Sequence, residues 1–229
     1  MNIGADATPA AHQTGRRPYR SPVRQAQARR TRARILEAAT EAFRSHGYPG
    51  TTVAAVAAGA GVSVAAVELA FPTKPDLLKA AIDVAIAGDD EPVPVLERPW
   101  AVAARAATDP ATFVDAVATV LVPAAERSDA LVLAALEGAR SDDRLVPLAE
   151  QLCAQRAVTA GWIVESLADK TPLRAGLDRT QAVDIVWLLM DPAVFDRLTI
   201  ARQWPPDRFG RFFADSLLRL LTEVVGSNR

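Results

Sequence analysis

The stretch from Thr51 to Lys79, TTVAAVAAGAGVSVAAVELAFPTKPDLLK, constrains the fold of this chain more than any other segment. Apolar or small residues recur in it with a helical period, and that period is interrupted once, at Gly61. Two short helices that cross steeply need small side chains where they touch and a residue that tolerates positive φ where the chain turns. The stretch therefore predicts two short helices hinged at Gly61.

Capping residues mark where these helices begin. Either Thr51 or Thr52 can accept a hydrogen bond from the first turn of the first short helix, and Ser63 can do so for the second. Thr73 and Asp76 have the spacing of a capping box and predict a further helix directly after the pair. Taken alone, this arrangement fits a DNA-binding helix-turn-helix and a packing unit of a helical bundle equally well.

The distribution of charge favours the DNA-binding interpretation. Eight arginines lie between positions 16 and 34, and no acidic residue occurs between Asp6 and Glu37. Residues 1–88 contain 11 Lys and Arg against 6 Asp and Glu, which leaves 15 basic and 21 acidic residues for 89–229. The net charge of −1 thus hides a basic N-terminal part, suited to neutralising phosphates, and an acidic remainder.

Several other classes of protein are disfavoured by the composition. One cysteine, Cys153, and two histidines predict neither a disulfide framework nor a metal cluster, and no cofactor is expected. The sequence shows neither a paired nucleophile and base nor a phosphate-binding glycine loop, so we do not expect an enzyme. The Arg-rich N-terminus lacks the apolar core of a signal peptide, and the two short helices are too broken to span a bilayer, so we expect a cytoplasmic protein without a membrane partner.

The chain divides into three expected parts. Residues 1–23 are predicted to be a disordered basic arm, 24–88 a helix-turn-helix DNA-binding domain, and 89–229 an effector-binding and dimerisation domain. The segment 88–99, GDDEPVPVLERP, is acidic and rich in proline and marks the boundary.

Every periodic segment of the chain is helical in character, and no alternating strand pattern of useful length occurs. The predicted fold class is therefore all-α, with an N-terminal three-helix helix-turn-helix head and a larger C-terminal helical bundle. Besides the two short helices, the expected helices cover residues 25–46, 74–87, 99–107, 110–125, 128–140, 143–169, 178–190, 192–201 and 205–226.

A set of residues in the first third of the chain also carries a family resemblance. The set comprises ILEAATEAF at 35–43, Gly47, Thr51–Thr52, Ala60–Ser63, Phe71, Lys74 and Leu77–Leu78. In this order the residues resemble the TetR family of one-component bacterial transcriptional regulators. The C-terminal part is similar to the effector and dimerisation domain of that family at Trp187, Asp191–Pro192, Phe195, Trp204 and the helix from Phe209 to Leu221.

The resemblance implies a repressor that binds double-stranded DNA as a homodimer. The second short helix of each subunit would enter successive major grooves of a palindromic operator, with half-sites about one helical turn apart or somewhat more. A small-molecule effector of unknown identity would bind in the body of the protein, spread the heads and release the DNA. The helices expected at 178–190 and 205–226 would pair with their copies in a four-helix bundle.

The resemblance and the Arg-rich segment together supply candidate DNA-binding residues. Thr52 and Lys74 match family positions that touch the DNA backbone, although Lys74 alone also fits a solvated lysine at a helix start. Ser63 is suited both to capping and to phosphate binding. The arginines of the arm either follow the minor groove or only improve solubility. The candidates are Arg29, Arg30, Thr52, Ser63, Val64, Ala65, Ala66, Glu68 and Lys74.

The expected recognition helix departs from the family pattern. Where the family usually has a polar or basic residue, a Gly, a Thr and an aromatic, this chain has the run Val64–Glu68. Glu68 replaces the aromatic that contacts phosphate in the family, and it either accepts from a cytosine amine or pairs with an arginine of the arm. Ala and Val side chains offer only apolar contact, so we expect phosphates and DNA shape to supply much of the affinity.

Candidate residues for the effector pocket and the dimer interface come from the second part of the chain. The pocket candidates are Trp100, Phe113, Leu121, Trp162, Trp187 and Met190, although residues of this kind more often simply form a core. Arg140, Arg156 and Glu165 could orient a polar ligand, but charges on solvated helix faces are far commoner. The last helix has an apolar surface wider than one contact requires, which favours a partner subunit but also fits a helix central to its own subunit. The interface candidates are Ile185, Phe209, Phe213, Leu217 and Leu220.

A rival function remains open at the level of sequence. The apolar recognition helix and Glu68 are also compatible with a small-molecule-binding or scaffolding helical protein whose DNA-binding head is degenerate.

Overall fold

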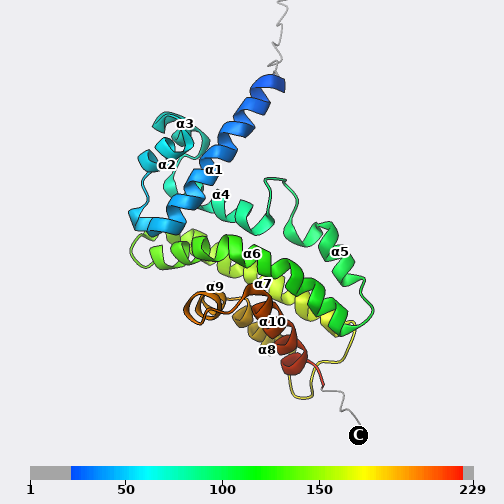
Figure 1. Ribbon diagram of the computed structural model, residues 1–229. Helices are drawn as coiled ribbons and strands as arrows, with labels where there is room; N and C mark the ends of the chain where they lie inside the picture. The colour runs from blue at the N-terminus through cyan, green and yellow to red at the C-terminus, as the bar shows by residue number, and fades with distance from the viewer. Residues whose placement is uncertain (1–21, 224–229) are drawn as a thin grey trace, which may run out of the picture.

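The computed structural model describes residues 22–223, and its regular elements are all helical (Figure 1). The only strand-like feature in this range is an isolated bridge between Leu173 and Thr222. Helices α1–α4 form a small head, and α5–α10 form a larger body. The predicted all-α fold class is confirmed.

The head contains α1 (Pro22–Gly50), α2 (Val53–Ala60), α3 (Val64–Ala70) and α4 (Lys74–Ala87). Regular helical geometry in α1 is broken at Gly47, whose φ of 63° is accessible to glycine at little cost. The first helix was expected to begin at Gln25, but it begins at Pro22, a residue type that fits the first turn of a helix. The predicted disordered arm at 1–23 lies outside the described residues, apart from its last two positions, which are helical.

The ends of the two short helices follow the predicted capping pattern. Thr52 accepts a hydrogen bond from the amide of Ala55, and Ser63 accepts one from the amide of Ala66. Gly61 sits between them with a left-handed φ of 61°. The axes of α2 and α3 meet at 103°.

None of the helices described is by itself long and apolar enough to cross a bilayer.

Thr51 has a different task from Thr52. Its hydroxyl donates to the carbonyl oxygens of Ala42 and Gly47, at 3.0 and 2.8 Å, and the side chain is buried. Thr51 therefore ties the turn back to α1, while Thr52 caps α2. Thr73 and Asp76 form the predicted capping box at the start of α4, and Gly88 ends that helix with a φ of 87°.

The body is built around a long helix, α6. Short 3₁₀ segments, η1 (Val95–Glu97) and η2 (Asp143–Leu145), precede α5 and α7 respectively. A π-helical segment, η3 (Arg197–Ala201), follows α9. The helices of the body are α5 (Pro99–Arg105), α6 (Pro110–Gly138), α7 (Val146–Ala168), α8 (Arg179–Leu189), α9 (Pro192–Asp196) and α10 (Pro206–Leu221).

Two expectations for the body were wrong. The helices expected at 110–125 and 128–140 are one continuous helix, α6, even though Pro123 lies inside it. An interior proline costs about 3 kcal/mol, but eleven residues of α6 are buried, so packing outweighs the lost hydrogen bond. The last helix ends at Leu221 and not at position 226, because Thr222 turns into an extended conformation and caps it.

Helix α6 belongs to both apolar cores of the subunit. Its C-terminal part packs with α1 and α4 in the core of the head, which includes Leu131, Ala134 and Ala135. Its N-terminal part packs with α7, α9 and α10 in the core of the body, which includes Phe113 and Val117. The head thus rests on one end of α6, while the expected division at residues 88 and 89 stays a prediction.

The left-handed turn at Gly61 leads to a test of the helix-turn-helix geometry. Gly61→Ala adds a side chain where φ is positive and where the new Cβ would lie 3.0 Å from the guanidinium of Arg34. We expect a loss of about 1–2 kcal/mol in the free energy of unfolding, measured by urea denaturation. The matched control is Gly161→Ala in α7, where a Cβ meets nothing within 4 Å, so the variant should gain up to about 1 kcal/mol. Equal effects of the two substitutions would contradict this account.

Candidate functional site

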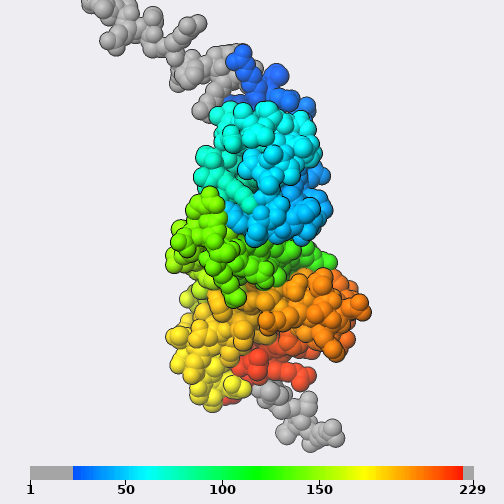
Figure 2. Space-filling model, turned by 90° about the vertical axis from the view of Figure 1, so that its left-hand side faces the viewer, coloured from blue at the N-terminus to red at the C-terminus, as the bar shows by residue number. Residues whose placement is uncertain are grey.

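Helix α3 presents a free face at one end of the molecule. Val67 packs into the core of the head, whereas Val64, Ala65 and Glu68 point away from it and are exposed. Leu69, which the sequence did not single out, is 89% exposed. In Figure 2 the cyan surface of α2 and α3 lies at the opposite end from the orange and red surface of the last helices. A duplex can therefore approach α3 without any rearrangement of the subunit.

Two arginines of the basic segment hold this face in place. The guanidinium of Arg34 donates to the carbonyl oxygens of Ala60 and Gly61 at the end of α2. The guanidinium of Arg32 lies 4.4 Å from the ring centre of Phe71, the residue that ends α3. These contacts fix the end of α2 and the end of α3 relative to α1.

Other basic residues of α1 remain available. Arg24, Arg29 and Arg30 are exposed on the first turns of α1, which extend beyond α2 and α3 (Figure 1). The structure thus separates the arginine run into a pair with partners in the head, Arg32 and Arg34, and a group that forms no hydrogen bond or ion pair within residues 22–223. Sequence reasoning treated them alike because composition does not show which side chains have partners.

The candidate phosphate ligands lie in different environments. The hydroxyls of Thr52 and Ser63 are at exposed helix N-termini and already accept from Ala55 and Ala66. The ammonium group of Lys74 lies 4.1 Å from the ring centre of Tyr48, and burial lowers its pKa. Lys74 is therefore partly desolvated in the free subunit.

A large cavity lies in the body beneath the head. Its volume is about 1160 Å³, and α4, the segment 89–98, α6, α7 and the start of α9 line it. Of the six predicted pocket residues, Trp100, Leu121, Trp162 and Met190 line this cavity. Phe113 is fully buried and packs on Trp162, with 5.8 Å between ring centres.

Trp187, the sixth predicted pocket residue, does not line the cavity but contacts a residue that does. Trp187 lies under the guanidinium of Arg156, 3.9 Å from it, and its indole nitrogen donates to the carbonyl oxygen of Cys153. Arg156 lines the cavity and forms an ion pair of 2.8 Å with Asp191. Arg140 and Glu165, the other expected polar contacts, are exposed and do not belong to the lining.

An acidic residue that sequence reasoning missed lies in this lining. Asp129 is on α6, and burial, followed by the nearby carboxylate of Asp191, raises its pKa to about 7. The residue interrupts an apolar stripe formed by Ala125, Val132 and Leu136, and that interruption could have identified it. Within residues 22–223, no group of acidic, His or Cys side chains is arranged to hold a metal ion.

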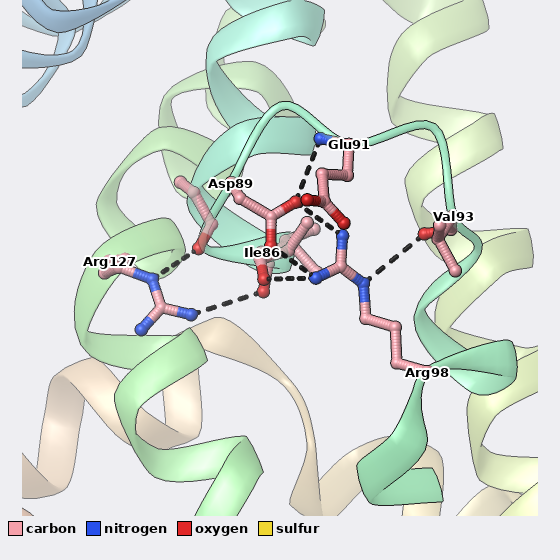
Figure 3. Close-up of polar contacts among 8 residues, drawn as sticks. Ile86, Asp89, Glu91, Val93, Arg98 and Arg127 are labelled. Atoms are coloured by element: carbon pink, nitrogen blue, oxygen red, sulfur yellow. Dashed lines mark hydrogen bonds and ion pairs between the residues drawn. The ribbon is translucent and has the colours of Figure 1, made fainter.

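Two arginines fasten the segment that borders the cavity (Figure 3). Arg98 forms two contacts with Asp89, of 2.6 and 2.8 Å, and also donates to the carbonyls of Ala87 and Val93. Arg127, on α6, donates to the carbonyl of Ala85 at 2.8 Å and to that of Ile86. The last turn of α4 is thus bonded directly to α6 beside the cavity.

The candidate interface residues are divided between core and surface. Phe209, Phe213 and Leu217 are buried among α6, α9 and α10 of their own subunit, so the apolar width of α10 does not by itself require a partner. Leu220 is 39% exposed and Ile185 is half-buried. Leu188 on α8, which was not among the candidates, is 59% exposed.

Comparison with known proteins relates the head of this chain to a family. Residues 35–81, which run from the middle of α1 into α4, match the profile of "Bacterial regulatory proteins, tetR family". The match covers the head and does not extend into the body. Among curated proteins, none matches the sequence of this chain significantly.

Solved structures extend the likeness to the whole fold. The regulator FadR from Bacillus subtilis, in complex with stearoyl-CoA, is 16% identical, with a TM-score of 0.64 over 82% of this chain and 98% of its own. A putative TetR-family regulator from Rhodococcus sp. is 17% identical, with a TM-score of 0.63 over 85% and 100%. A putative regulator from Saccharomonospora viridis, in complex with choline, is 17% identical, with a TM-score of 0.62 over 84% and 98%.

The raised pKa of Asp129 gives a prediction for stability. Its pKa is about 7 in the folded protein and about 3.9 in an unfolded chain. The folded state therefore holds the carboxyl proton of Asp129 more tightly than the unfolded chain does. The contribution of this proton to stability falls as pH rises from about 4 to about 7. Relative to the wild type, the free energy of unfolding of Asp129→Asn should increase by about 2 kcal/mol between pH 5 and pH 8. This corresponds to roughly 4–8 °C in Tm.

Thermal denaturation at the two pH values checks this prediction. Asp115→Asn, on an exposed position of the same helix, is the matched control and should follow the wild type at both. A difference between Asp129→Asn and the wild type that does not change with pH would contradict it.

Proposed function

We propose that the protein is a homodimeric transcriptional repressor that binds palindromic operator DNA and is released by a small-molecule effector. The observation that carries the proposal is the exposed face of α3, held by Arg34 and Arg32 at one end of the molecule. A short helix presented in this way is the geometry with which helix-turn-helix proteins enter the major groove.

The chemistry of the face favours phosphate and shape readout over base-specific hydrogen bonds. Val64, Ala65 and Leu69 offer apolar contacts, such as those made with thymine methyl groups. Glu68 is the one exposed charged side chain of α3 and suits a cytosine amine. Arg29 and Arg30, with Thr52, Ser63 and Lys74 as further candidates, supply the backbone contacts.

The DNA-binding proposal is tested with variants of the two elements. In gel-shift titrations against the DNA flanking its own gene, Ala65→Asp should abolish specific binding, because a carboxylate would be added at the centre of the exposed α3 face. Arg29→Ala with Arg30→Ala should weaken binding to all sequences and lower the salt slope by up to about 2 per subunit.

The control for both variants is Ala103→Asp, an exposed alanine on α5. It should bind as the wild type does, and circular dichroism should show all variants folded. If the wild type shows no preference among DNA sequences, operator binding is refuted. That outcome would favour the rival function, a ligand-binding or scaffolding protein with a degenerate head.

Release by a ligand is supported by how the cavity adjoins the head. The segment after α4 borders the cavity, and Arg127 bonds the last turn of α4 to α6. Arg44 of α1 donates to the carbonyl oxygens of Glu126 and Arg127, at 2.7 Å each. A ligand that displaces α6 or the segment 89–98 would therefore pull on both α1 and α4, and so reorient α3.

The ligands of similar structures do not decide the effector of this protein. One neighbour in fold holds stearoyl-CoA, whose phosphates are anionic, and another holds choline, a cation. The fold thus accommodates opposite charges, and the effector class must follow from the side chains of this cavity. The effector site in this proposal includes Trp100, Leu121 and Trp162.

Dimerisation is proposed through the outer surfaces of α8 and α10, which pack against each other within the subunit. Leu188 and Leu220 are exposed there, with Ile185 half-buried beside them in α8. Large aliphatic side chains on adjacent helices are what a symmetric four-helix contact would bury. The interface candidates buried inside the subunit would only support this surface from below.

Leu188→Glu with Leu220→Glu tests the interface. Because each substitution places a carboxylate in the proposed contact, sedimentation equilibrium should give a dimer for the wild type and a monomer for the double variant at the same micromolar concentration. Val102→Glu, at a 64% exposed position on α5, is the control and should stay dimeric. A double variant that remains dimeric would exclude this surface as the interface.

A further inference from the structure

The charged groups of the cavity carry information about its ligand. Seven acidic and three basic side chains line it, within an otherwise largely apolar wall. Four of the seven carboxylates, those of Asp83, Asp89, Asp90 and Asp191, form ion pairs with basic side chains, while those of Glu91, Glu97 and Asp129 form none within residues 22–223. Unpaired carboxylates around an apolar volume of this size favour a ligand of the opposite sign. Whether an anion could also bind depends on whether the three arginines are free.

Each of the three arginines is engaged within the subunit. Arg98 is held by Asp89 with contacts of 2.6 and 2.8 Å, and Arg127 by carbonyl oxygens of α4. Arg156 is paired with Asp191 at 2.8 Å and lies over the ring of Trp187, while its buried Nε has no hydrogen-bond partner among the described residues. An anionic ligand would therefore have to reach this one N–H group or break one of the existing contacts.

Asp129 is in the opposite situation. Among residues 22–223, no basic side chain lies within 4.0 Å of its carboxylate, although the residue is half-buried in the cavity wall. A buried carboxylate without a close counter-ion is costly unless a ligand supplies the charge. Sites that bind charged ligands commonly hold such groups at the expense of stability.

Aromatic rings complete the environment. Trp100 and Trp162 both line the cavity and pack edge to face, with 5.8 Å between ring centres. Indole rings attract cations through their negative faces, and quaternary ammonium groups are often bound in this way. The same rings, with Leu121 and Met190, suit an apolar body of the ligand.

We propose that the cavity binds an apolar molecule that carries a positive charge, an amine or a quaternary ammonium, with Asp129 as its counter-ion and Trp100 and Trp162 beside the apolar part. This inference rests on the proposed function of the cavity as the effector site and adds the chemical class of the effector. It sets this cavity apart from one built for a carboxylate or a phosphate.

Proton binding at Asp129 is coupled to this ligand. The groups that face its carboxyl are Arg156 on α7, Asp191 before α9, Asp196 on α9 and the neighbouring Ser128. Burial and the two other carboxylates keep the proton on Asp129 near neutral pH. A bound cation favours the ionised form, so the affinity for a permanent cation should rise with pH and level off above about pH 7.

Three probes with one tail and different headgroup charges test the proposal. Decyltrimethylammonium, decanol and decanoate are titrated into the full-length protein below their micelle concentrations, with tryptophan fluorescence and calorimetry as readouts. The cation should bind about tenfold or more tightly than either of the others at pH 8. Its affinity should increase from pH 5.5 to pH 8.

Variants localise the effect. Asp129→Asn should lower the affinity for the cation about tenfold and remove its pH dependence, while leaving that for decanol unchanged. Asp115→Asn, on the outer face of α6, is the matched control and should bind all probes as the wild type does. Both variants are checked for folding by circular dichroism.

The outcomes separate the two proposals. Binding of decanoate or decanol as tight as that of the cation, or cation binding that ignores Asp129→Asn, would overturn the cationic class and leave an effector cavity standing. If none of the three probes binds, both the cationic class and the proposed role of this cavity fail. Gel shifts of the wild type without any probe report on operator binding independently.

Discussion

The structure depends on one helix being buried in two cores. α6 packs by its C-terminal half against α1 and α4, and by its N-terminal half against α7, α9 and α10. Because a close-packed interior transmits displacement and does not absorb it, a displacement of helices in the body is transmitted to the head. The hydrogen bonds of Arg127 and Arg44 fall where these two cores meet, and they join α6 to both long helices of the head.

The distribution of charge follows the same division into head and body. In the head, Arg32 and Arg34 contact the ends of α3 and α2, Arg44 bonds to α6, and Arg24, Arg29 and Arg30 are exposed without such partners among the described residues. In the body, each arginine of the cavity wall has a partner, while Asp129 faces Arg156 but forms no ion pair within 4.0 Å among the described residues. The molecule therefore offers a positive surface at one end and a negative cavity nearer its middle, and these two properties underlie both proposals.

Local sequence signals predicted the head well because its geometry is local. Thr52, Ser63 and Thr73 cap the helices that they precede, and Gly61 takes the left-handed φ that the hinge requires. The body was predicted less well. Pro123 and the polar residues near it do not interrupt α6, since burial of that helix on several sides outweighs local preference. Four of the six predicted pocket residues line the cavity, but Asp129 and Arg127 were missed because their roles arise from contacts far along the chain. Arg98 was missed because its bonds to Ala87, Asp89 and Val93 lie in a loop and follow no regular spacing.

The amino-acid sequence by itself determined the helical class, the helix-turn-helix, its caps and the basic character of the N-terminal part, since each follows from neighbouring residues or from composition. Tertiary structure alone decided which arginines remain exposed, that Phe209, Phe213 and Leu217 are buried in their own subunit, and that a carboxylate faces an apolar cavity. A side chain becomes a ligand, a staple or part of a core only through partners brought together by folding. Those partners lie dozens of residues away, where no local pattern records them.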